Sequence, residues 1–523
     1  MHIQPSSSIG MDDQSSEILQ NVFKALQQAD PSYENVSYGM SVNNSFPSNW
    51  LIQSGPDDTE CQFLQTIQQL LKSFVIDQPT LSHFIDLSQM GNQNSSDEFQ
   101  SAMIESISAI AQVAKAPVII RYIEGNPAGS SESNTMTFIN HLKNAYQGPT
   151  NSQVYFYAVS FVKPWEGAPI PGLPGSWTHA KMVAVDGQSS TAGGMNFWND
   201  YLPSHTPPHD VSININGAAA GFSHLFANAI WQYAAGPQRS GSIFNASWQL
   251  GTANFGQQFP PQFDPNTFIT PVQPQAIPVL AVGNLGLWES TAMQSLLQEA
   301  LAGIANPAKQ VNPQSTYQIV ENAFNVLLSF PFSNFDTSTS KATNASTTAR
   351  HLILQQVSQN GHIRLSQQKI ADTDLVERAI KDGKGGVPWP GQMMDALVDA
   401  MVRKNAKLDI IVSFHQTGPS PVDGYSDDMG AAALKIVFIQ LLTRALGGDA
   451  NKANSLANQL LTIKATTDAN HAKIWIVDDL VFYVGSDNVY PAYLQEFGYV
   501  IGSQQLTELF IQNYWEKMWQ IAR

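Results

Sequence analysis

Residues 178–196 read THAKMVAVDGQSSTAGGMN, and residues 470–488, which lie 292 positions further along, read NHAKIWIVDDLVFYVGSDN. The two stretches share five residue types at the same relative positions: His179, Lys181, Asp186, Gly193 and Asn196 in the first, and His471, Lys473, Asp478, Gly485 and Asn488 in the second. Each stretch alternates as a strand does, turns at its acidic position and continues as a second strand to a glycine-rich corner. The sequence therefore predicts one β-hairpin motif that occurs twice.

The residue types in this motif suit a phosphate group. His and Lys two positions apart on a strand point to the same face, so each copy places an imidazole beside an ammonium group. Lysine and asparagine donate hydrogen bonds to phosphoryl oxygens, and neutral imidazole attacks phosphorus. Two copies that face each other supply a nucleophile and a general acid, as in-line displacement of an alkoxide requires. A single copy would favour a buried histidine and a solvated lysine, but the repeat favours a shared site.

The repeat extends to the elements before each hairpin. A helix-like run leads into the apolar strand PVIIRY at Pro117, and a second helix-like run leads into DIIVSF at Asp409, again 292 positions later. Strands that alternate with helices predict an α/β fold. We expect two similar fused α/β lobes, each a mixed sheet flanked by helices, with the active site at their interface. The Gly-, Pro-, Asn- and Gln-rich stretch 236–276 is the expected boundary, giving lobes 1–275 and 276–523.

The two copies resemble the HxKxxxxD signature, followed by GGxN or GSxN, of the phospholipase D superfamily. The stretches GGMNFWNDYL (193–202), HDVSININGAAA (209–220) and FYVGSDNVYPAYLQEFGYVI (482–501) are similar to the secreted actinomycete-type phospholipases D. The resemblance implies hydrolysis of phosphatidylcholine-type glycerophospholipids to phosphatidate and free alcohol through a phosphohistidine, with transphosphatidylation to other alcohols. A phosphatidylserine or cardiolipin synthase of the same superfamily is the alternative, ahead of a nuclease or a non-catalytic lipid-binding protein.

The resemblance also implies roles for the motif residues. His179 would be the nucleophile, and His471 the general acid that protonates the leaving alkoxide and later activates water, although the symmetry of the two copies leaves this order open. Two lysines and two asparagines would contact the phosphate oxygens: Lys181, Lys473, Asn196 and Asn488. Asp186 and Asp478 each lie five residues beyond a lysine, at the predicted strand end, and are expected to hold the geometry of the motif.

Five further candidates lie outside the motif positions. Asp210, 31 residues after His179, and Glu496, 25 residues after His471, match acidic residues that orient the imidazoles in the resembling enzymes. The family pattern implies that they work crosswise, Glu496 with His179 and Asp210 with His471. Three aromatic residues are candidates for a wall that binds the cationic choline group through cation–π attraction: Trp198, Tyr201 and Tyr425. Ordinary packing is the alternative for the two tyrosines.

The charge of the chain narrows its partners. The net charge is −16, with 26 Lys and Arg residues against 42 Asp and Glu residues and no basic run. This balance argues against nucleic acid and against strongly anionic membranes, and it favours a zwitterionic lipid. We expect a monomer that meets a membrane or micelle surface peripherally. The loops 162–177 and 415–430 are the candidates for this contact, with a buried loop as the competing interpretation.

Neither a cofactor nor a metal is expected. A lysine beside each histidine would repel a divalent cation, and HTPPHD (205–210) is interpreted mainly as a loop. The single cysteine, Cys61, excludes an intramolecular disulfide, whereas the secreted relatives generally carry several cysteines. The first residues also lack the charged and apolar regions of a signal peptide. Secretion is therefore expected from the resemblance alone, with a cytoplasmic location as the alternative.

Overall fold

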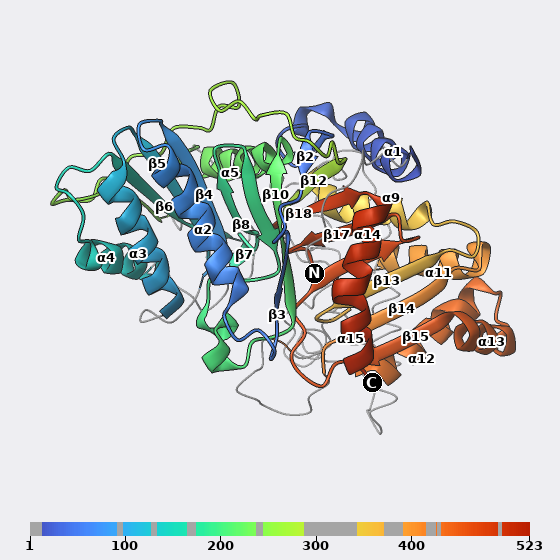
Figure 1. Ribbon diagram of the computed structural model, residues 1–523. Helices are drawn as coiled ribbons and strands as arrows, with labels where there is room; N and C mark the ends of the chain where they lie inside the picture. The colour runs from blue at the N-terminus through green and yellow to red at the C-terminus, as the bar shows by residue number, and fades with distance from the viewer. Residues whose placement is uncertain are drawn as a thin grey trace, which may run out of the picture.

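The computed structural model describes residues 13–91, 98–126, 133–164, 174–236, 244–286, 343–370, 391–414, 425, 430–489 and 494–523. They form two mixed β-sheets, each with helices on its outer face (Figure 1). The prediction of two similar fused α/β lobes is confirmed. None of the helices within the described ranges has both the length and the apolar character that crossing a membrane requires.

The first sheet has ten strands in the order β11-β6-β5-β4-β8-β9-β10-β2, with β3 paired to β10 and β7 paired to β6. Its strands are β2 (Asn44–Ser45), β3 (Leu51–Ser54), β4 (His83–Met90), β5 (Val118–Gly125), β6 (Val154–Pro164), β7 (Pro174–Trp177), β8 (Lys181–Val185), β9 (Ser189–Gly193), β10 (Asp210–Gly217) and β11 (Phe244–Gln249). The neighbours β6, β5 and β4 run parallel, and β4, β8, β9 and β10 pair antiparallel. The first motif thus forms the β8–β9 hairpin.

The second sheet has eight strands in the order β1-β12-β18-β17-β16-β13-β14-β15. Its strands are β1 (Tyr38–Ser41), β12 (Val279–Leu285), β13 (His362–Gln367), β14 (Lys407–Val412), β15 (Leu461–Ala465), β16 (Lys473–Val477), β17 (Val481–Gly485) and β18 (Gln495–Gly502). The parallel run β15-β14-β13 and the antiparallel run β13-β16-β17-β18 repeat the pattern of the first sheet. The second motif forms the β16–β17 hairpin, in the same place as its counterpart.

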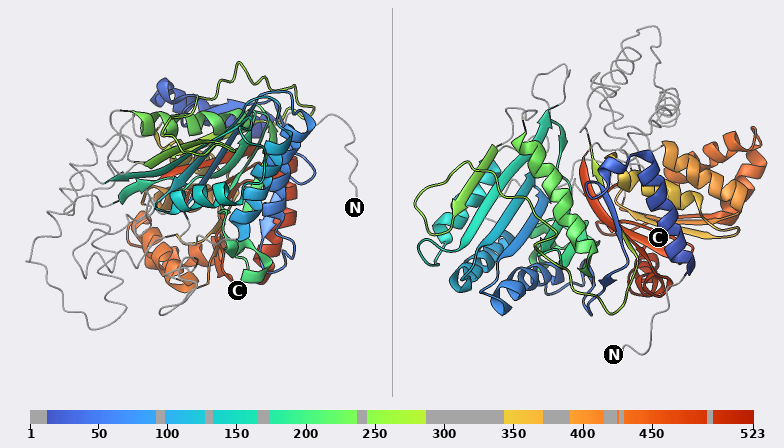
Figure 2. Two further views of the ribbon diagram at one scale, coloured as in Figure 1. Left: turned by 90° about the vertical axis from the view of Figure 1, so that its left-hand side faces the viewer. Right: turned by 90° about the horizontal axis from the view of Figure 1, so that it is seen from above.

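Helices divide the molecule into layers (Figure 2). The outer face of the first sheet is covered by α2 (Gln62–Asp77), α3 (Glu98–Val113) and α4 (Ser133–Ala145). The outer face of the second is covered by α1 (Asp13–Ala29), α9 (Ala345–Gln355), α11 (Gly391–Lys404), α12 (Gly430–Ala445) and α13 (Ala450–Leu460). Between the sheets, α5 (Ala219–Ala235), α14 (Gln504–Phe510), a π-helical turn (Ile511–Trp515) and α15 (Glu516–Ile521) join one core with residues from both sheets.

The N-terminal segment does not follow the expected division into 1–275 and 276–523. Strand β1 pairs with β12 of the second sheet, with Tyr38 opposite Val282. The apolar side of α1, with Leu19, Val22 and Leu26 fully buried, packs in the core of the second lobe. Burial of these side chains outweighs the proximity in sequence to the first lobe. The N-terminal helix and first strand therefore belong to the second sheet.

The acidic residue of each motif fixes its hairpin to the neighbouring strand. Asp186 (φ 54°) and Asp478 (φ 55°) both occupy the left-handed region at the turn. The Asp186 carboxylate accepts the Phe84 N–H at 2.7 Å and contacts His83 Nδ1 at 2.7 Å. The Asp478 carboxylate accepts the N–H groups of His362 at 2.9 Å and Ser358 at 2.6 Å. In both lobes the turn is thus held by a carboxylate that satisfies backbone donors at the start of the adjacent strand.

We predict that Asp478→Ala lowers the free energy of unfolding by about 2–4 kcal/mol, because two backbone donors lose their acceptor. Asp479→Ala is the matched control, because Asp479 lies at the same turn with positive φ but has a 44% exposed side chain paired with Arg364. Its cost should stay below about 1 kcal/mol. Urea unfolding followed by tryptophan fluorescence measures both values, and equal losses would contradict the assigned role.

Candidate active site

Backbone hydrogen bonds join the two motif hairpins across the lobes. The N–H groups of His179 and Ala180 both donate to the Gln495 carbonyl at 2.8 Å, and the His471 N–H donates to the His209 carbonyl at 2.8 Å. Gln495 and His209 immediately precede the acidic residues Glu496 and Asp210. In each lobe, backbone N–H groups at the motif histidine therefore donate to the other lobe at the residue just before the acidic residue. This register brings each carboxylate to the histidine of the opposite lobe.

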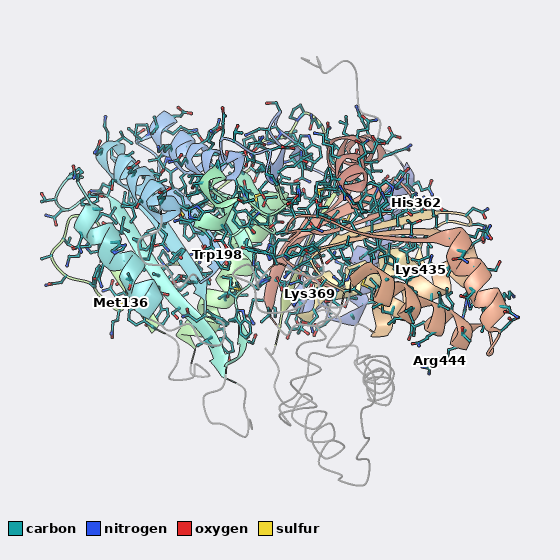
Figure 3. All side chains as sticks on the ribbon, turned by 90° about the horizontal axis from the view of Figure 1, so that it is seen from below. Met136, Trp198, His362, Lys369, Lys435 and Arg444 are labelled. Atoms are coloured by element: carbon teal, nitrogen blue, oxygen red, sulfur yellow. The ribbon has the colours of Figure 1, made fainter. Side chains whose placement is uncertain are left out.

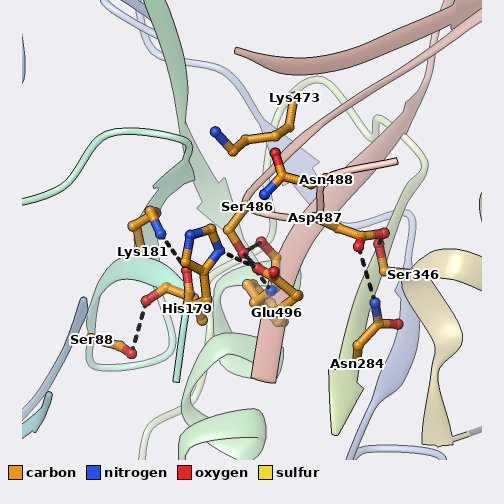
Figure 4. A network of polar contacts seen from close by, with 12 residues as sticks. Ser88, His179, Lys181, Asn284, Ser346, Lys473, Ser486, Asp487, Asn488 and Glu496 are labelled. Carbon is orange, nitrogen blue, oxygen red and sulfur yellow. Dashed lines mark hydrogen bonds and ion pairs between the residues drawn. The ribbon is translucent and has the colours of Figure 1, made fainter. Parts of the chain in front are cut away.

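The first histidine–carboxylate pair is His179 with Glu496. The His179 Nδ1–H group donates to Glu496 Oε2 at 2.9 Å, and the Ser486 hydroxyl donates to the same oxygen (Figure 4). Both members are buried, and Glu496 is fully so. A carboxylate bonded to Nδ1 fixes the ring orientation and leaves Nε2 as the free nitrogen. Nε2 of His179 is thus the nitrogen available for chemistry.

The second pair is His471 with Asp210. The His471 Nδ1–H group donates to Asp210 Oδ2 at 2.8 Å, and the Tyr201 hydroxyl donates to the same oxygen at 2.8 Å. The Val211 N–H group donates to the other carboxylate oxygen at 2.8 Å. The structure thus has the crosswise pairing that the family pattern implies. Because each pair takes one member from each lobe, the site is complete only when both lobes are together.

Four buried donor side chains surround the pairs. The Lys181 ammonium donates to the His179 carbonyl at 2.6 Å, and the Lys473 ammonium donates to the His471 carbonyl. Both amide atoms of Asn196 and the Oδ1 atom of Asn488 are buried and have no hydrogen-bond partner within the described ranges. Buried polar atoms are seldom left unsatisfied, and an anion would satisfy the donors among them. The group is suited to a tetrahedral oxyanion such as a phosphate diester.

Burial lowers the pKa values of both imidazoles. The pKa of His179 lies well below its usual value because of burial and the positive charges of Lys181 and Lys473. Burial and Lys473 lower the pKa of His471 to about 3, against the opposing effect of Asp210. Both rings are therefore uncharged at neutral pH. A bound phosphate anion would raise both pKa values, because a nearby negative charge favours the protonated ring.

The charged partners are shifted as well. Burial lowers the pKa of Lys181 to about 7 and that of Lys473 to about 8. Burial raises the pKa of Glu496 to about 7, although Lys181 opposes the shift. Burial alone would raise the pKa of Asp210, but its contacts with His471 and the charge of Lys473 outweigh this effect and hold the pKa below its usual value. Perturbed groups of this kind gather at functional sites.

The three aromatic candidates have different surroundings. Trp198 lies in the first lobe (Figure 3). Its indole N–H donates to the Met90 carbonyl at 3.1 Å, and its side chain is half-buried. Tyr201 is fully buried against Phe63, so its ring does not line an open wall as expected. The Tyr425 ring is edge-on to the His471 ring, and the two ring centroids lie 5.1 Å apart.

Most of the two loops expected to contact lipid lies outside the described residues, namely 165–173, 415–424 and 426–429. Three residues at the site were not among the expected ones: Ser486, which contributes its hydroxyl, and Gln495 and His209, which contribute their carbonyls. Their positions in the sequence could have indicated these contacts. Ser486 lies inside the GSDN corner, and Gln495 and His209 directly precede the acidic residues. Within the described ranges, no group of three or more His, Cys, Asp or Glu side chains is placed as metal ligands.

A scan against protein-family models finds no match. Among curated proteins, the chain is similar to a phospholipase D of Streptomyces antibioticus, with 24% identity over 504 residues, which cover 91% of this chain and 82% of the relative. Among solved structures, phosphatidylserine synthase of Haemophilus influenzae Rd KW20 has a TM-score of 0.48 and 12% identity, covering 95% of this chain and 91% of that chain. The phospholipase D family member Nuc of Salmonella typhimurium has a TM-score of 0.20 and 21% identity, covering 34% of this chain and 91% of that chain.

Sequence similarity and the doubled motif both point to the phospholipase D superfamily. The similarity to the Streptomyces protein spans nearly the whole chain. Both copies of HxKxxxxD form matching hairpins in two similar sheets, β8–β9 and β16–β17. The resemblance to the phospholipase D superfamily is therefore confirmed over nearly the whole chain.

Proposed function

We propose that this protein is a phospholipase D that hydrolyses phosphatidylcholine-type glycerophospholipids to phosphatidate and the free head-group alcohol, and that it transfers the phosphatidyl group to other primary alcohols. Similarity to a phospholipase D indicates a phosphodiesterase or phosphatidyltransferase. The observation that carries the proposal is the pair of buried histidine–carboxylate contacts across the lobes, His179 with Glu496 and His471 with Asp210. They supply a nucleophile and a general acid for one phosphodiester.

In the first step, Nε2 of His179 attacks phosphorus and the bond between phosphorus and the head-group oxygen breaks. His471, which has been protonated at Nε2 with the phosphate bound, gives that proton to the leaving oxygen, so the alcohol departs neutral. Lys181, Lys473 and the amides of the two motif asparagines would stabilise the negative charge on the non-bridging oxygens. The product is a phosphatidyl-histidine at His179 and a neutral His471.

In the second step, His471 accepts a proton from water or from an alcohol, whose oxygen attacks phosphorus. The phosphorus–nitrogen bond breaks, and His179 returns to its neutral form. Water gives phosphatidate, and a primary alcohol gives a new phospholipid, so one intermediate accounts for both outcomes. Glu496 would stabilise the positive charge that the His179 ring carries as long as phosphorus is attached.

The substrate class is supported by charge and by similarity. A net charge of −16 repels polyanions such as nucleic acids. The buried aromatic ring of Tyr425 lies beside His471, where it would attract a cationic head group near the leaving oxygen. The similar protein of Streptomyces antibioticus is named phospholipase D. These points favour a zwitterionic phospholipid over a nucleic acid.

The proposal is tested by the release of choline and phosphatidate from phosphatidylcholine micelles, with phosphatidylethanol expected in place of phosphatidate when ethanol is present. DNA cleavage without choline release would contradict the lipid assignment. A synthase would prefer serine or glycerol to water, which the ratio of products shows. A protein that only binds lipid would pellet with liposomes but give no turnover.

We predict that Glu496→Gln slows formation of the phosphohistidine by about 10²-fold or more, because the amide keeps the shape of the side chain but cannot stabilise the charged ring. Rapid-quench measurement of the first turnover reports this step. Glu508→Gln is the control, because Glu508 is exposed and accepts a hydrogen bond from Gln504 on α14. Near-normal first turnover in Glu496→Gln would show that the carboxylate does not act on His179.

We predict that kcat/KM falls as the pH rises from about 7 to above 8, because Lys181 and Lys473 have pKa values of about 7 and 8 and are charged only below them. Bound substrate raises both pKa values, since its phosphate is negative. The decline in kcat should therefore occur at higher pH than the decline in kcat/KM. Monomeric short-chain phosphatidylcholine, which does not titrate in this range, is the substrate for the measurement. Coincident declines would contradict the prediction.

A further inference from the structure

We propose that Tyr201 is a positioning residue that acts on His471 through Asp210 and so prepares the general acid. This inference rests on the proposed function, and it replaces the expected role of Tyr201 in a choline-binding wall. It concerns the first step only, in which the leaving oxygen receives a proton.

The Tyr201 hydroxyl contacts both members of the second histidine–carboxylate pair. Its hydroxyl donates to Asp210 Oδ2 at 2.8 Å and lies 3.0 Å from His471 Nδ1, which contacts the same carboxylate oxygen at 2.8 Å. Tyr201 lies in a short 3₁₀ turn, Asn199–Tyr201, directly after the first motif. Its fully buried ring packs against Phe63 in the core of the first lobe. The hydroxyl is therefore held at a fixed place beside the carboxylate.

The other pair obtains its hydroxyl in a different way. Glu496 accepts from Ser486, which lies inside the second motif. The equivalent position of the first motif is Gly194, where a Cβ atom would lie only 2.1 Å from Oδ1 and 2.8 Å from Cγ of Asp210. A serine therefore has no space beside the shorter acidic residue. The first lobe supplies the hydroxyl from outside its motif, through Tyr201.

The two carboxylates are consequently stabilised to different extents. Asp210 accepts hydrogen bonds from Tyr201, from the Val211 N–H group and from His471, so both of its oxygens have donors. For Glu496, the Oε1 atom is buried and has no partner in the part of the chain that the structure describes. Donors to a carboxylate favour its ionised form. The ionised form of Asp210 is therefore better stabilised by hydrogen bonds than the ionised form of Glu496.

An ionised Asp210 stabilises the protonated ring of its partner histidine, which a general acid needs before the leaving group departs. Removal of the Tyr201 hydroxyl would leave a buried carboxylate oxygen with one donor fewer. The protonated form of the His471 ring would then be less stable, and the orientation of the ring would be less fixed. The loss should matter only for a leaving group that requires a proton.

The test compares wild type with Tyr201→Phe on two lipids that differ only in the leaving group, phosphatidylcholine and phosphatidyl-p-nitrophenol. The measured quantity is kcat/KM, which covers the steps up to departure of that group. We expect a loss of about tenfold or more on phosphatidylcholine, as for a hydrogen bond to a charged group. On phosphatidyl-p-nitrophenol the loss should be less than about twofold, because p-nitrophenolate leaves without a proton. Equal losses on both lipids would overturn the inference.

Tyr499→Phe is the matched control. Tyr499 is fully buried on β18, and its hydroxyl donates to Ser190 at 3.1 Å and contacts Ser223, not Asp210 or His471. Any loss in this variant should be the same for both lipids. In an Asp210→Asn background, Tyr201→Phe should have little further effect, because the partner through which it acts has been changed. Full additivity of the two substitutions would contradict action through Asp210.

A binding measurement gives a result that does not depend on turnover. Tyr201 contacts Asp210 and His471 and makes no hydrogen bond to Lys181 or Lys473. Inorganic phosphate, measured by calorimetry, should therefore bind Tyr201→Phe within about twofold of wild type. A much larger loss would mean that Tyr201 shapes the anion site itself, against the inference. The wild-type rate on phosphatidylcholine tests the proposed function separately, and the ratio between the two lipids tests Tyr201.

Discussion

The structure depends on two buried imidazole–carboxylate contacts that cross between the lobes. His179 and His471 each lie on one sheet and take their carboxylate from the other. The crossed backbone bonds to Gln495 and His209 set the register that makes these contacts possible. Removal of one member of either pair would leave a buried ionisable group without its partner, which is costly. Duplication thus yields one site, because neither lobe holds a complete pair.

Charge compensation explains how two lysines remain in the same interior. Lys181 and Lys473 are almost fully buried, and the charges of Glu496 and Asp210 raise the pKa values of both lysines. Burial lowers the pKa of each lysine toward neutrality, which favours loss of the proton. A phosphate diester would add the negative charge that keeps both ammonium groups protonated. The site is therefore best stabilised with an anion bound between the lobes.

The sequence predicted the parts of the molecule that repeat or alternate locally. The two hairpins, the strands before them and the two-lobe α/β fold followed from matched spacing, and the carboxylates Asp210 and Glu496 lie where the resemblance placed them, beside the opposite histidines. The docking of α1 and β1 on the second sheet was not predictable, because an amphipathic helix does not specify which lobe buries it. The Tyr201 hydroxyl was missed because aromatic residues near a lipid site suggested ring contacts.

A covalent phosphohistidine at His179 is tested most directly by mass spectrometry of the protein quenched during turnover. Phosphatidyl-p-nitrophenol is the substrate of choice, since its leaving group departs rapidly and lets the intermediate accumulate. Quenching in denaturant at alkaline pH, followed by digestion, should give a phosphatidyl adduct on the peptide that contains His179. An adduct on the peptide that contains His471 would reverse the two roles. Absence of any adduct during demonstrated turnover would contradict the covalent mechanism.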